Sequence, residues 1–275
     1  MQISEVNIYP IKSLRGISLD LSRVESRGLQ YDRRWMLVDK NNWFLTQRQF
    51  PKMATIAVEI NGNGLTASIG SGGDSPIRIP LEPGNGAKSA RVRIWRNRCS
   101  AIAYEPEVNE WFGDVLGASV RLVYMPDITK RLAHAPYKVK ADDHVSFADG
   151  FPFLLIGGGS LADINSRLDQ PVPMKRFRPN FVVLGTVPFE EDTWKRIRIG
   201  DNVFHVVKSC GRCIITTTDQ ETGVRNGGEP LKTLASYRTN RIGKKNKVLF
   251  GQNLIADKPG GVVKVGDEVE VLDWK

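Results

Sequence analysis

The sequence predicts a mainly β protein of the α+β class. Short runs that alternate apolar and polar residues fill the N-terminal third, and Gly, Asn or Pro separates one run from the next. Only residues 103–117 show the three- and four-residue spacing of a long amphipathic helix. The chain has 275 residues, of which 41% are hydrophobic, so it can bury the core of one large or two modest domains.

The N-terminal strands are short and closely spaced, which predicts a small antiparallel barrel or curled sheet. The expected strands cover residues 3–8, 35–39, 44–46, 55–60, 65–69, 77–81 and 91–95. The glycine-rich segment 70–74 indicates a loop. It is not a phosphate-binding loop, because no Gly-Lys-Ser or Gly-Lys-Thr follows it.

The helix expected at residues 103–117 has a clear core-facing stripe. Val108, Phe112 and Val115 recur on one face, and Gly117 follows as a C-terminal stop. We expect this helix to join two domains. The expected organisation is a β-rich domain over residues 1–95, a connecting helix over 96–119 and a second domain over 120–275.

The second domain is expected to contain more strands and one short helix. Ser160 and Asp163 have the spacing of a helix capping box. A charged, proline-containing connection over 126–144 has the character of a lid over a site. Strands are expected at residues 120–125, 153–156, 181–184 and 214–218, with a hairpin over 262–271.

Composition limits the class of function. The formal charge of +9 is spread along the chain without a nucleic-acid-binding motif, so we expect an anionic cofactor or an acidic redox partner instead of nucleic acid. Three cysteines cannot supply the four thiolates of an iron-sulfur cluster. The apolar runs are too short to span a membrane and no signal core is present, so we expect a soluble, cytoplasmic protein with no membrane partner.

Cys210 and Cys213 form a C-x-x-C pair ahead of a β-branched run, next to Arg212. Such a pair is typical of half a zinc site, of a thioredoxin-like redox pair or of two core thiols. A zinc site needs further ligands, and no second pair of cysteines or histidines follows. A redox pair normally lies at a helix N-terminus, whereas residues 214–218 favour a strand.

Three polar segments are suited to holding an anion. Lys12 and Ser13 follow a proline-ended strand, Arg33 precedes another strand, and Arg178-Pro-Asn180 joins a guanidinium to a rigid turn and an amide. Taken alone, the first two segments are more typical of a solvated strand end, and Arg178 is as typical of an arginine that pairs with a nearby carboxylate.

The stretch from Cys210 to Arg238 resembles the signature of MOSC domains. The matching residues are Cys210-Gly-Arg-Cys213, Thr217, Asp219, Thr222-Gly223, Glu229-Pro-Leu231, Leu234 and Tyr237-Arg238. The segments Tyr-Pro-Ile-Lys-Ser, Asp-Arg-Arg-Trp, Phe-Ala-Asp and Arg-Phe-Arg-Pro-Asn extend the resemblance to mitochondrial amidoxime-reducing components and bacterial hydroxylaminopurine-resistance proteins. It implies an N-terminal β-rich barrel-like domain followed by a MOSC β-barrel domain.

The resemblance also implies a molybdenum cofactor, a molybdopterin, between the two domains. Cys213 would be the catalytic residue and the metal ligand. The implied cofactor-binding residues are Lys12, Ser13 and Arg33 at the phosphate, Arg178 and Asn180 at the pterin, Gly150 and Phe151 through their backbone, and Gly211 and Arg212 beside the metal. Gly150, Phe151 and Gly211 depart from the hydroxyl residues of relatives, so side-chain bonds there are lost or are replaced by backbone bonds.

The implied function is reduction of N-hydroxylated compounds, such as hydroxylamines, amidoximes and N-hydroxylated bases, in detoxification. Some bacterial relatives carry a C-terminal ferredoxin-like domain, which is not expected here, so electrons would come from a separate flavin or iron-sulfur reductase. No proton donor stands out, since Asp149 is a candidate only by its place in the motif. A sulfur transferase with a persulfide on Cys213 and a cofactor carrier without turnover remain as alternatives.

Overall fold

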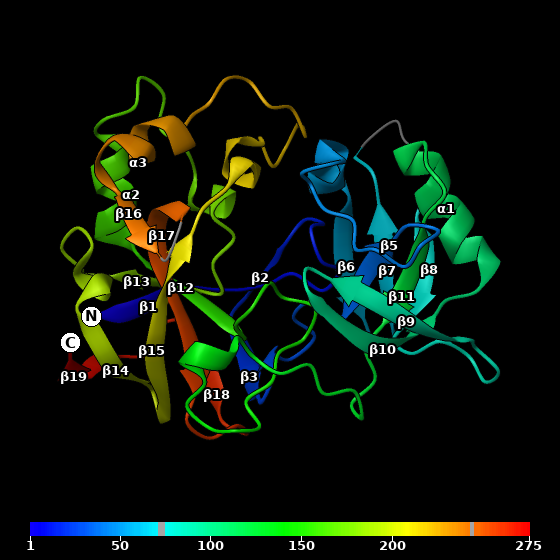
Figure 1. Cartoon of the computed structure of the whole chain (residues 1–275), viewed down its shortest axis with the longest axis horizontal. Helices are drawn as coiled ribbons and strands as arrows, with labels where there is room; N and C mark the ends of the chain where they lie inside the picture. Colours follow the sequence, from blue (N-terminus) through cyan, green and yellow to red (C-terminus); the bar gives the residue numbers. More distant parts are fainter. Residues whose placement is uncertain (71–74, 243–244) are drawn as a thin grey trace.

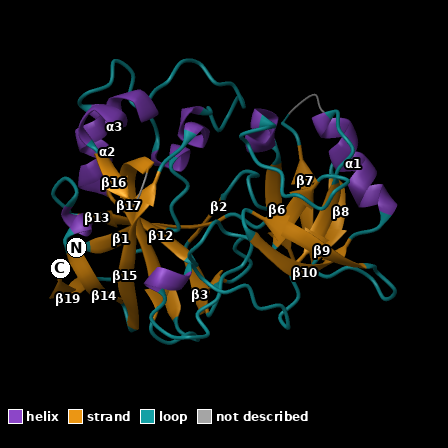
Figure 2. Ribbon diagram, viewed as in Figure 1, coloured by secondary structure: helices purple, strands orange, loops and turns teal. Residues whose placement is uncertain are grey.

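The computed structural model describes residues 1–70, 75–242 and 245–275. The chain forms a larger and a smaller lobe side by side, and both are built mainly from strands (Figures 1 and 2). The mainly β fold class is therefore confirmed. Part of the expected glycine-rich loop, residues 71–74, lies outside the described residues.

The larger lobe is organised on a nine-stranded sheet whose order is β19-β14-β15-β17-β12-β13-β1-β2, with β16 beside β17. Only β12 and β13 pair in parallel, and the other pairs of this sheet are antiparallel. The strands are β1 (Gln2–Ile8), β2 (Ile17–Leu19), β12 (Phe153–Gly157), β13 (Phe181–Leu184), β14 (Trp194–Ile199), β15 (Asn202–Gly211), β16 (Thr239–Ile242), β17 (Lys245–Ala256) and β19 (Val269–Trp274).

Aromatic side chains fill the core on one face of this sheet. Phe153, Phe181 and Phe204 are fully buried, and their ring centroids lie 5.3 to 5.8 Å apart. The helices α2 (Gly158–Asn165) and α3 (Leu231–Tyr237) pack against β12, β13 and β17, and together they cap one end of the lobe (Figure 2).

The smaller lobe contains two antiparallel sheets around a separate core. One is β5 (Trp35–Val38), β11 (Arg121–Tyr124), β10 (Asn97–Ala103) and β9 (Ser89–Ile94), in that order. The other is β6 (Ala57–Asn61), β7 (Gly64–Ser68) and β8 (Ile77–Pro80). The helix α1 (Pro106–Leu116) buries Val108, Phe112 and Val115 against these sheets and ends at Gly117 in the left-handed conformation, as predicted.

A third small sheet pairs β18 (Val262–Lys264), from near the C-terminus, with β3 (Leu21–Glu25), which pairs in turn with β4 (Gly28–Leu29). Five short 3₁₀ helices complete the described elements: η1 (Pro51–Thr55), η2 (Ala135–Tyr137), η3 (Met174–Arg176), η4 (Glu190–Asp192) and η5 (Ile214–Thr217). No helix in the described ranges has both the length and the apolar character that a membrane crossing requires.

The predicted domain bounds do not follow the sheets. β5, β10 and β11 lie in one sheet, although the prediction placed β5 in the first domain, β10 in the connecting helix and β11 in the second domain. β1 lies in the large sheet, although the prediction placed it in the first domain. We therefore propose that the smaller lobe extends to about residue 125, with the first strand contributed to the larger lobe.

Several local predictions were wrong. Residues 214–217 form η5 and not a strand, because the hydroxyls of Thr216 and Thr217 bond back to the carbonyls of Cys213 and Ile214. Residues 44–46 make only an isolated bridge. The expected hairpin over 262–271 is absent from the described pairs, since β18 pairs with β3 and β19 with β14.

Ser160 does not cap α2, which begins two residues earlier at Gly158. Its hydroxyl instead donates a 2.8 Å hydrogen bond to the buried Glu191 carboxylate and accepts one from the Phe189 N–H. The remaining predicted strands, at residues 3–8, 35–39, 55–60, 65–69, 77–81, 91–95, 120–125, 153–156 and 181–184, match observed strands within two residues at each end.

Candidate functional site

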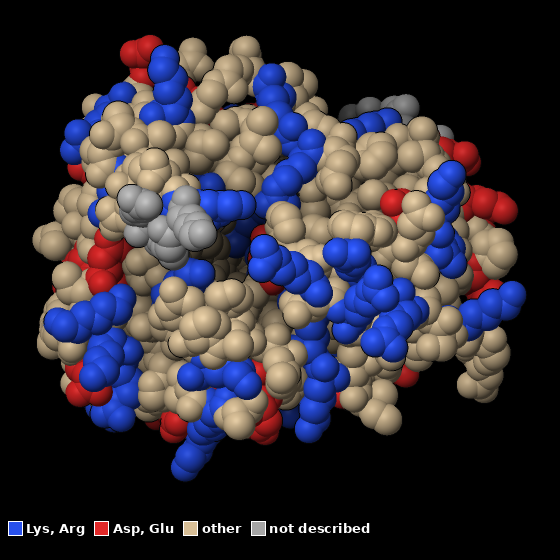
Figure 3. Space-filling model, viewed as in Figure 1, with Lys and Arg blue, Asp and Glu red and all other residues tan. Residues whose placement is uncertain are grey.

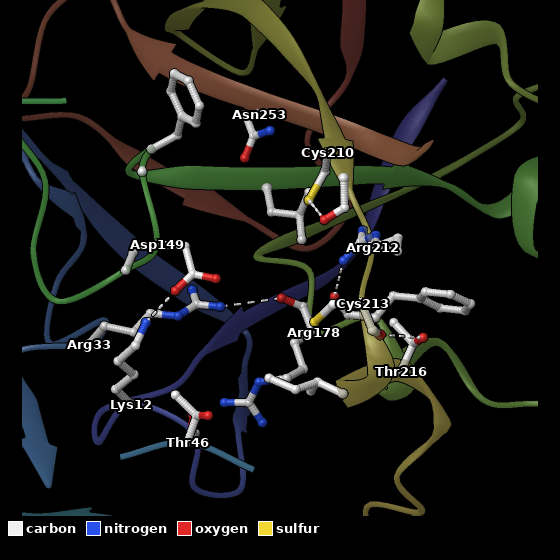
Figure 4. Close-up of a pocket in the computed structure, with 18 of the residues that line it drawn as sticks. Lys12, Arg33, Thr46, Asp149, Arg178, Cys210, Arg212, Cys213, Thr216 and Asn253 are labelled. Atoms are coloured by element: carbon white, nitrogen blue, oxygen red, sulfur yellow. Dashed lines mark hydrogen bonds and ion pairs between the residues drawn. The ribbon is translucent and has the colours of Figure 1, made fainter. Parts of the chain in front are cut away.

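One pocket between the two lobes is lined by every residue that the sequence singled out for a site. They are Lys12, Ser13, Arg33, Gly150, Phe151, Arg178, Asn180, Gly211, Arg212 and Cys213. Figure 4 shows Lys12 and Arg33 on one side of this space and Cys213 with Arg212 on the other. The structure thus brings together segments that are up to 200 residues apart, although the role of each residue stays a prediction.

The pocket is strongly basic. Its lining contains six Lys or Arg side chains against a single carboxylate, Asp149, which leaves a surplus of five positive charges. Thr46, Arg48, Arg176 and Cys210 also line the pocket and were not among the predicted site residues. A concave surface with this charge favours an anionic ligand.

The backbone is strained where it presents these side chains. Ser13, Arg33 and Arg178 have positive φ angles of 69°, 49° and 56°, a conformation that residues other than glycine rarely adopt. Trp95 beside the pocket has a φ of 52°. Such strain costs on the order of 1 to 3 kcal/mol at each residue and gathers at functional sites.

Arg33 and Arg178 lie against Tyr9, with their guanidinium carbons 4.3 and 4.1 Å from the centre of its ring. Arg33 is held further by the fully buried Asp32, at 2.6 Å, and by the Asn180 side-chain oxygen, at 3.1 Å. The Asn180 amide also donates to the Asn7 carbonyl. The Asn180 side chain therefore positions Arg33 through hydrogen bonds within the protein.

Arg178 has far fewer partners than Arg33. Its Nη1 donates a long bond of 3.4 Å to the Gln220 side chain, and its buried Nη2 has no hydrogen-bond partner among the described residues. Burial lowers the pKa of the Arg178 guanidinium to about 10. A buried donor without a partner is costly, so this group is suited to an anion that supplies one.

Lys12 is buried and pairs with Asp149 at 2.6 Å, while the Trp95 indole N–H donates to the same carboxylate oxygen at 3.2 Å. Desolvation raises the pKa of the Asp149 carboxyl, but the charge and hydrogen bond of Lys12 outweigh it, so the pKa lies below its usual range. Asp149 is therefore ionised at neutral pH. An ionised carboxylate does not serve as the proton donor that its place in the motif had suggested.

Cys213 lies just beyond β15, where the extended backbone turns into η5. The Arg48 Nη2 donates to the Cys213 sulfur at 3.0 Å, and the Arg48 guanidinium lies 4.7 Å from the centre of the Trp95 ring. This contact holds the sulfur at the pocket wall, where a cysteine can ligate a metal. No sequence pattern indicates this contact, because Arg48 is 165 residues away from Cys213 and its own segment carries no motif.

Arg212 points back into the protein and not to the surface. It donates to the carbonyls of Phe250 and Phe177 at 2.8 Å each, and its Nη2 is buried without a described partner. Gly211 leaves room for a side chain, since an added Cβ would come no closer than 3.6 Å to Lys247. The loss of a hydroxyl at Gly211 is therefore not forced by packing.

Gly150 and Phe151 border the pocket beside the 126–144 connection. The Gly150 carbonyl accepts from the His134 N–H at 3.2 Å, and the Phe151 ring packs on Tyr137. The backbone oxygen of Gly150 is thus already used within the protein. Whether the connection moves as a lid stays a prediction.

The three cysteines, all within the described part of the chain, are free thiols. Desolvation raises the pKa of Cys210, which suits an inert thiol better than a redox partner. Among the described residues no group of three or more His, Cys, Asp or Glu is placed to hold a metal ion.

Comparison with known proteins places this pocket in a family. Residues 1–119 match the MOSC N-terminal beta barrel domain, and residues 142–270 match the MOSC domain. The chain belongs to the family of MOSC-domain proteins that carry this N-terminal barrel. The pocket lies where these two domains meet.

Among its relatives, the chain is 33% identical to mitochondrial amidoxime-reducing component 1 of Homo sapiens, over 98% of this chain and 82% of that protein. It is 34% identical to mitochondrial amidoxime reducing component 2 of Rattus norvegicus, over 97% and 82%. It is also 32% identical to molybdenum cofactor sulfurase of Oryza sativa, over 91% of this chain but only 32% of that protein. The family and the names of these relatives point to a molybdenum cofactor and to oxidoreductase chemistry.

Proposed function

We propose that the pocket binds the molybdenum cofactor and that the chain is a cofactor-dependent reductase of N-hydroxylated compounds. The observation that carries this proposal is the presence of a cysteine beside Arg48 and a cluster of cations in one pocket between two domains. The unpartnered Nη2 atoms of Arg178 and Arg212 support this proposal, because an anionic or polar ligand would accept the hydrogen bonds that these buried donors lack.

The residues divide the binding between the two ends of the ligand. Lys12, Ser13 and Arg33 from the N-terminal segment would bind the terminal phosphate, with Arg178 from the MOSC domain beside them. Each charge-assisted hydrogen bond to phosphate contributes on the order of 1.5 to 3 kcal/mol. Because Lys12 is already paired with Asp149, it would exchange or share that partner when the phosphate binds.

Cys213 would ligate the metal, and Arg48 would hold the sulfur in position through the 3.0 Å contact. Phe151, Phe153 and Leu154 line the same pocket and would limit the access of water. When bound, the cofactor would supply the two-electron chemistry that removes oxygen from a substrate.

The overall reaction balances as an N-hydroxylated compound plus two electrons and two protons giving the amine, or its equivalent, and water. A separate flavin or iron-sulfur reductase would deliver the electrons. The names of the amidoxime-reducing relatives support this reaction, and a role in detoxification would follow from it. Asp149 is ionised at neutral pH, so we expect solvent to supply the protons.

The experiment is a turnover assay with protein made in cells that synthesise the cofactor. Dithionite serves as the electron source, and benzamidoxime and 6-hydroxylaminopurine serve as substrates. We expect amine formation that depends on the protein and on molybdate during growth. Loaded protein that reduces neither substrate would refute the reductase. Thiocyanate formed on cyanide treatment, as cyanide takes the outer sulfur of a Cys213 persulfide and leaves the thiolate, would then favour the transferase alternative.

A further inference from the structure

The β9–β10 hairpin of the smaller lobe carries an unusual row of arginines. Ala90, Val92 and Ile94 point into the core, as do Cys99 and Ala101 of the facing strand. The outward positions and the tip instead hold Arg91, Arg93, Arg96 and Arg98. None of these four forms an ion pair with an acidic side chain in the described ranges.

Two of these arginines face each other directly. Arg93 and Arg98 are cross-strand partners in the antiparallel register, where side chains stand about 4.5 to 5.5 Å apart at Cβ. Like charges in such a pair destabilise a sheet. Among the described pairs β10 meets β11 only at Ile102 and Ala103, so Arg98 lies on a stretch of β10 whose strand partner is β9, and charge there also protects the sheet edge from aggregation.

The tip of this hairpin touches the pocket. The Trp95 indole N–H donates to the Asp149 carboxylate, which pairs with Lys12. The face of the same indole ring contacts the Arg48 guanidinium, which in turn donates to the Cys213 sulfur. Figure 3 shows Lys and Arg side chains gathered over β9 and β10, to one side of the hollow between the lobes. The basic row thus lies beside the mouth of the pocket.

We propose that Arg91, Arg93, Arg96 and Arg98 form a docking surface for an acidic electron-transfer protein. The inference rests on the proposed function, because it assigns the surface through which the reductase would receive electrons. Complementary charge would speed the encounter and place the donor next to Trp95 and the pocket mouth. Nucleic acid would also be attracted to arginines, but a nucleic-acid site gives no reason for the row to adjoin the thiol pocket.

The test uses reduced flavodoxin, an acidic flavoprotein, as the probe donor for the loaded full-length protein. In the variant R91E/R98E the introduced carboxylate at position 98 would face Arg93, so the hairpin is expected to fold. The matched control K195E/K232E makes the same charge change on β14 and α3 of the other lobe, where neither lysine has an ion pair in the described part of the chain.

We expect R91E/R98E to raise the KM for flavodoxin about 10-fold or more and to flatten its dependence on salt. Dithionite-driven turnover should equal that of the wild type, and K195E/K232E should match the wild type with both donors. The proposal fails if R91E/R98E keeps the wild-type KM and salt dependence, or if both variants lose flavodoxin turnover equally.

A binding measurement separates this proposal from the proposed function. Fluorescence anisotropy of labelled flavodoxin reports docking without any turnover, so it remains informative if dithionite drives no reduction. We expect binding that R91E/R98E weakens about 10-fold or more and K195E/K232E does not. Wild-type protein that binds a single-stranded oligothymidine but not flavodoxin would overturn the proposal and favour a nucleic-acid surface.

Discussion

Replacing Cys213 with alanine is expected to abolish reduction of N-hydroxylated substrates, with a loss on the order of 1000-fold or more. Such a loss corresponds to about 4 kcal/mol of transition-state stabilisation. The reason is that Cys213 is the proposed metal ligand and the pocket offers no second sulfur next to Arg48. The measurement is dithionite-driven turnover of benzamidoxime by protein purified from cells that make the cofactor.

Cys210→Ala is the matched control, because it removes the other thiol of the same C-x-x-C pair. Cys210 also lines the pocket, but burial raises the pKa of its thiol, and within the described residues that thiol makes a single weak hydrogen bond, to the Gly211 carbonyl. We expect this variant to keep turnover within about 3-fold of the wild type, a change of roughly 0.7 kcal/mol. Equal loss in both variants would contradict the assignment of Cys213 as the single ligand and favour a reaction that uses both thiols.

Replacing Arg178 with methionine is expected to weaken cofactor retention about 10- to 150-fold without lowering the stability of the cofactor-free protein. The lost charge-assisted bond accounts for about 1.5 to 3 kcal/mol. Among the described residues the guanidinium makes one long hydrogen bond and a contact with the Tyr9 ring, and the cost of its buried, unpartnered Nη2 offsets that contact in the empty pocket. Pterin retained after gel filtration and urea unfolding of the cofactor-free protein provide the two readouts.

Arg33→Met, unlike Arg178→Met, is expected to lower the free energy of unfolding of the cofactor-free protein. Asp32 is fully buried and loses its ion-pair partner, keeping only the bond from the Tyr9 N–H at 2.8 Å. Breaking a buried pair in this way costs about 3 to 5 kcal/mol, which should appear as a lower free energy of unfolding. If Arg178→Met destabilises the empty protein as much as Arg33→Met does, Arg178 is a structural residue and its assignment to the ligand is wrong.

Sequence patterns predicted the helices and strands correctly where local periodicity decides the structure. The β1, β5 and β9 strands and the α1 helix follow from alternating or helical patterns, and Gly117 ends its helix as a left-handed glycine normally does. The pattern misled at residues 214–217, where β-branched residues predicted a strand. The threonine hydroxyls there satisfy nearby carbonyls, which favours a tight 3₁₀ turn that no β propensity describes.

The site residues also divide into those that a local motif indicates and those that only a tertiary contact reveals. Lys12, Arg33, Arg178 and Cys213 were found through short motifs, and the fold brings them to one pocket. Arg48 was missed because its importance comes only from a contact made across the lobes with Cys213. The pairing of Asp149 with Lys12, which fixes the charge of that carboxyl, likewise joins residues 137 positions apart and leaves no local pattern.

The most direct test of the account is the molybdenum and pterin content of the wild-type chain. The chain is produced in molybdate-fed cells that synthesise the cofactor, beside a known molybdoenzyme as a loading control. Metal is measured by elemental analysis and pterin by the fluorescence of its oxidised form. We predict close to one molybdenum and one pterin per chain. A chain that carries neither, while the control enzyme is fully loaded, would contradict the claim that this basic pocket is a molybdenum-cofactor site.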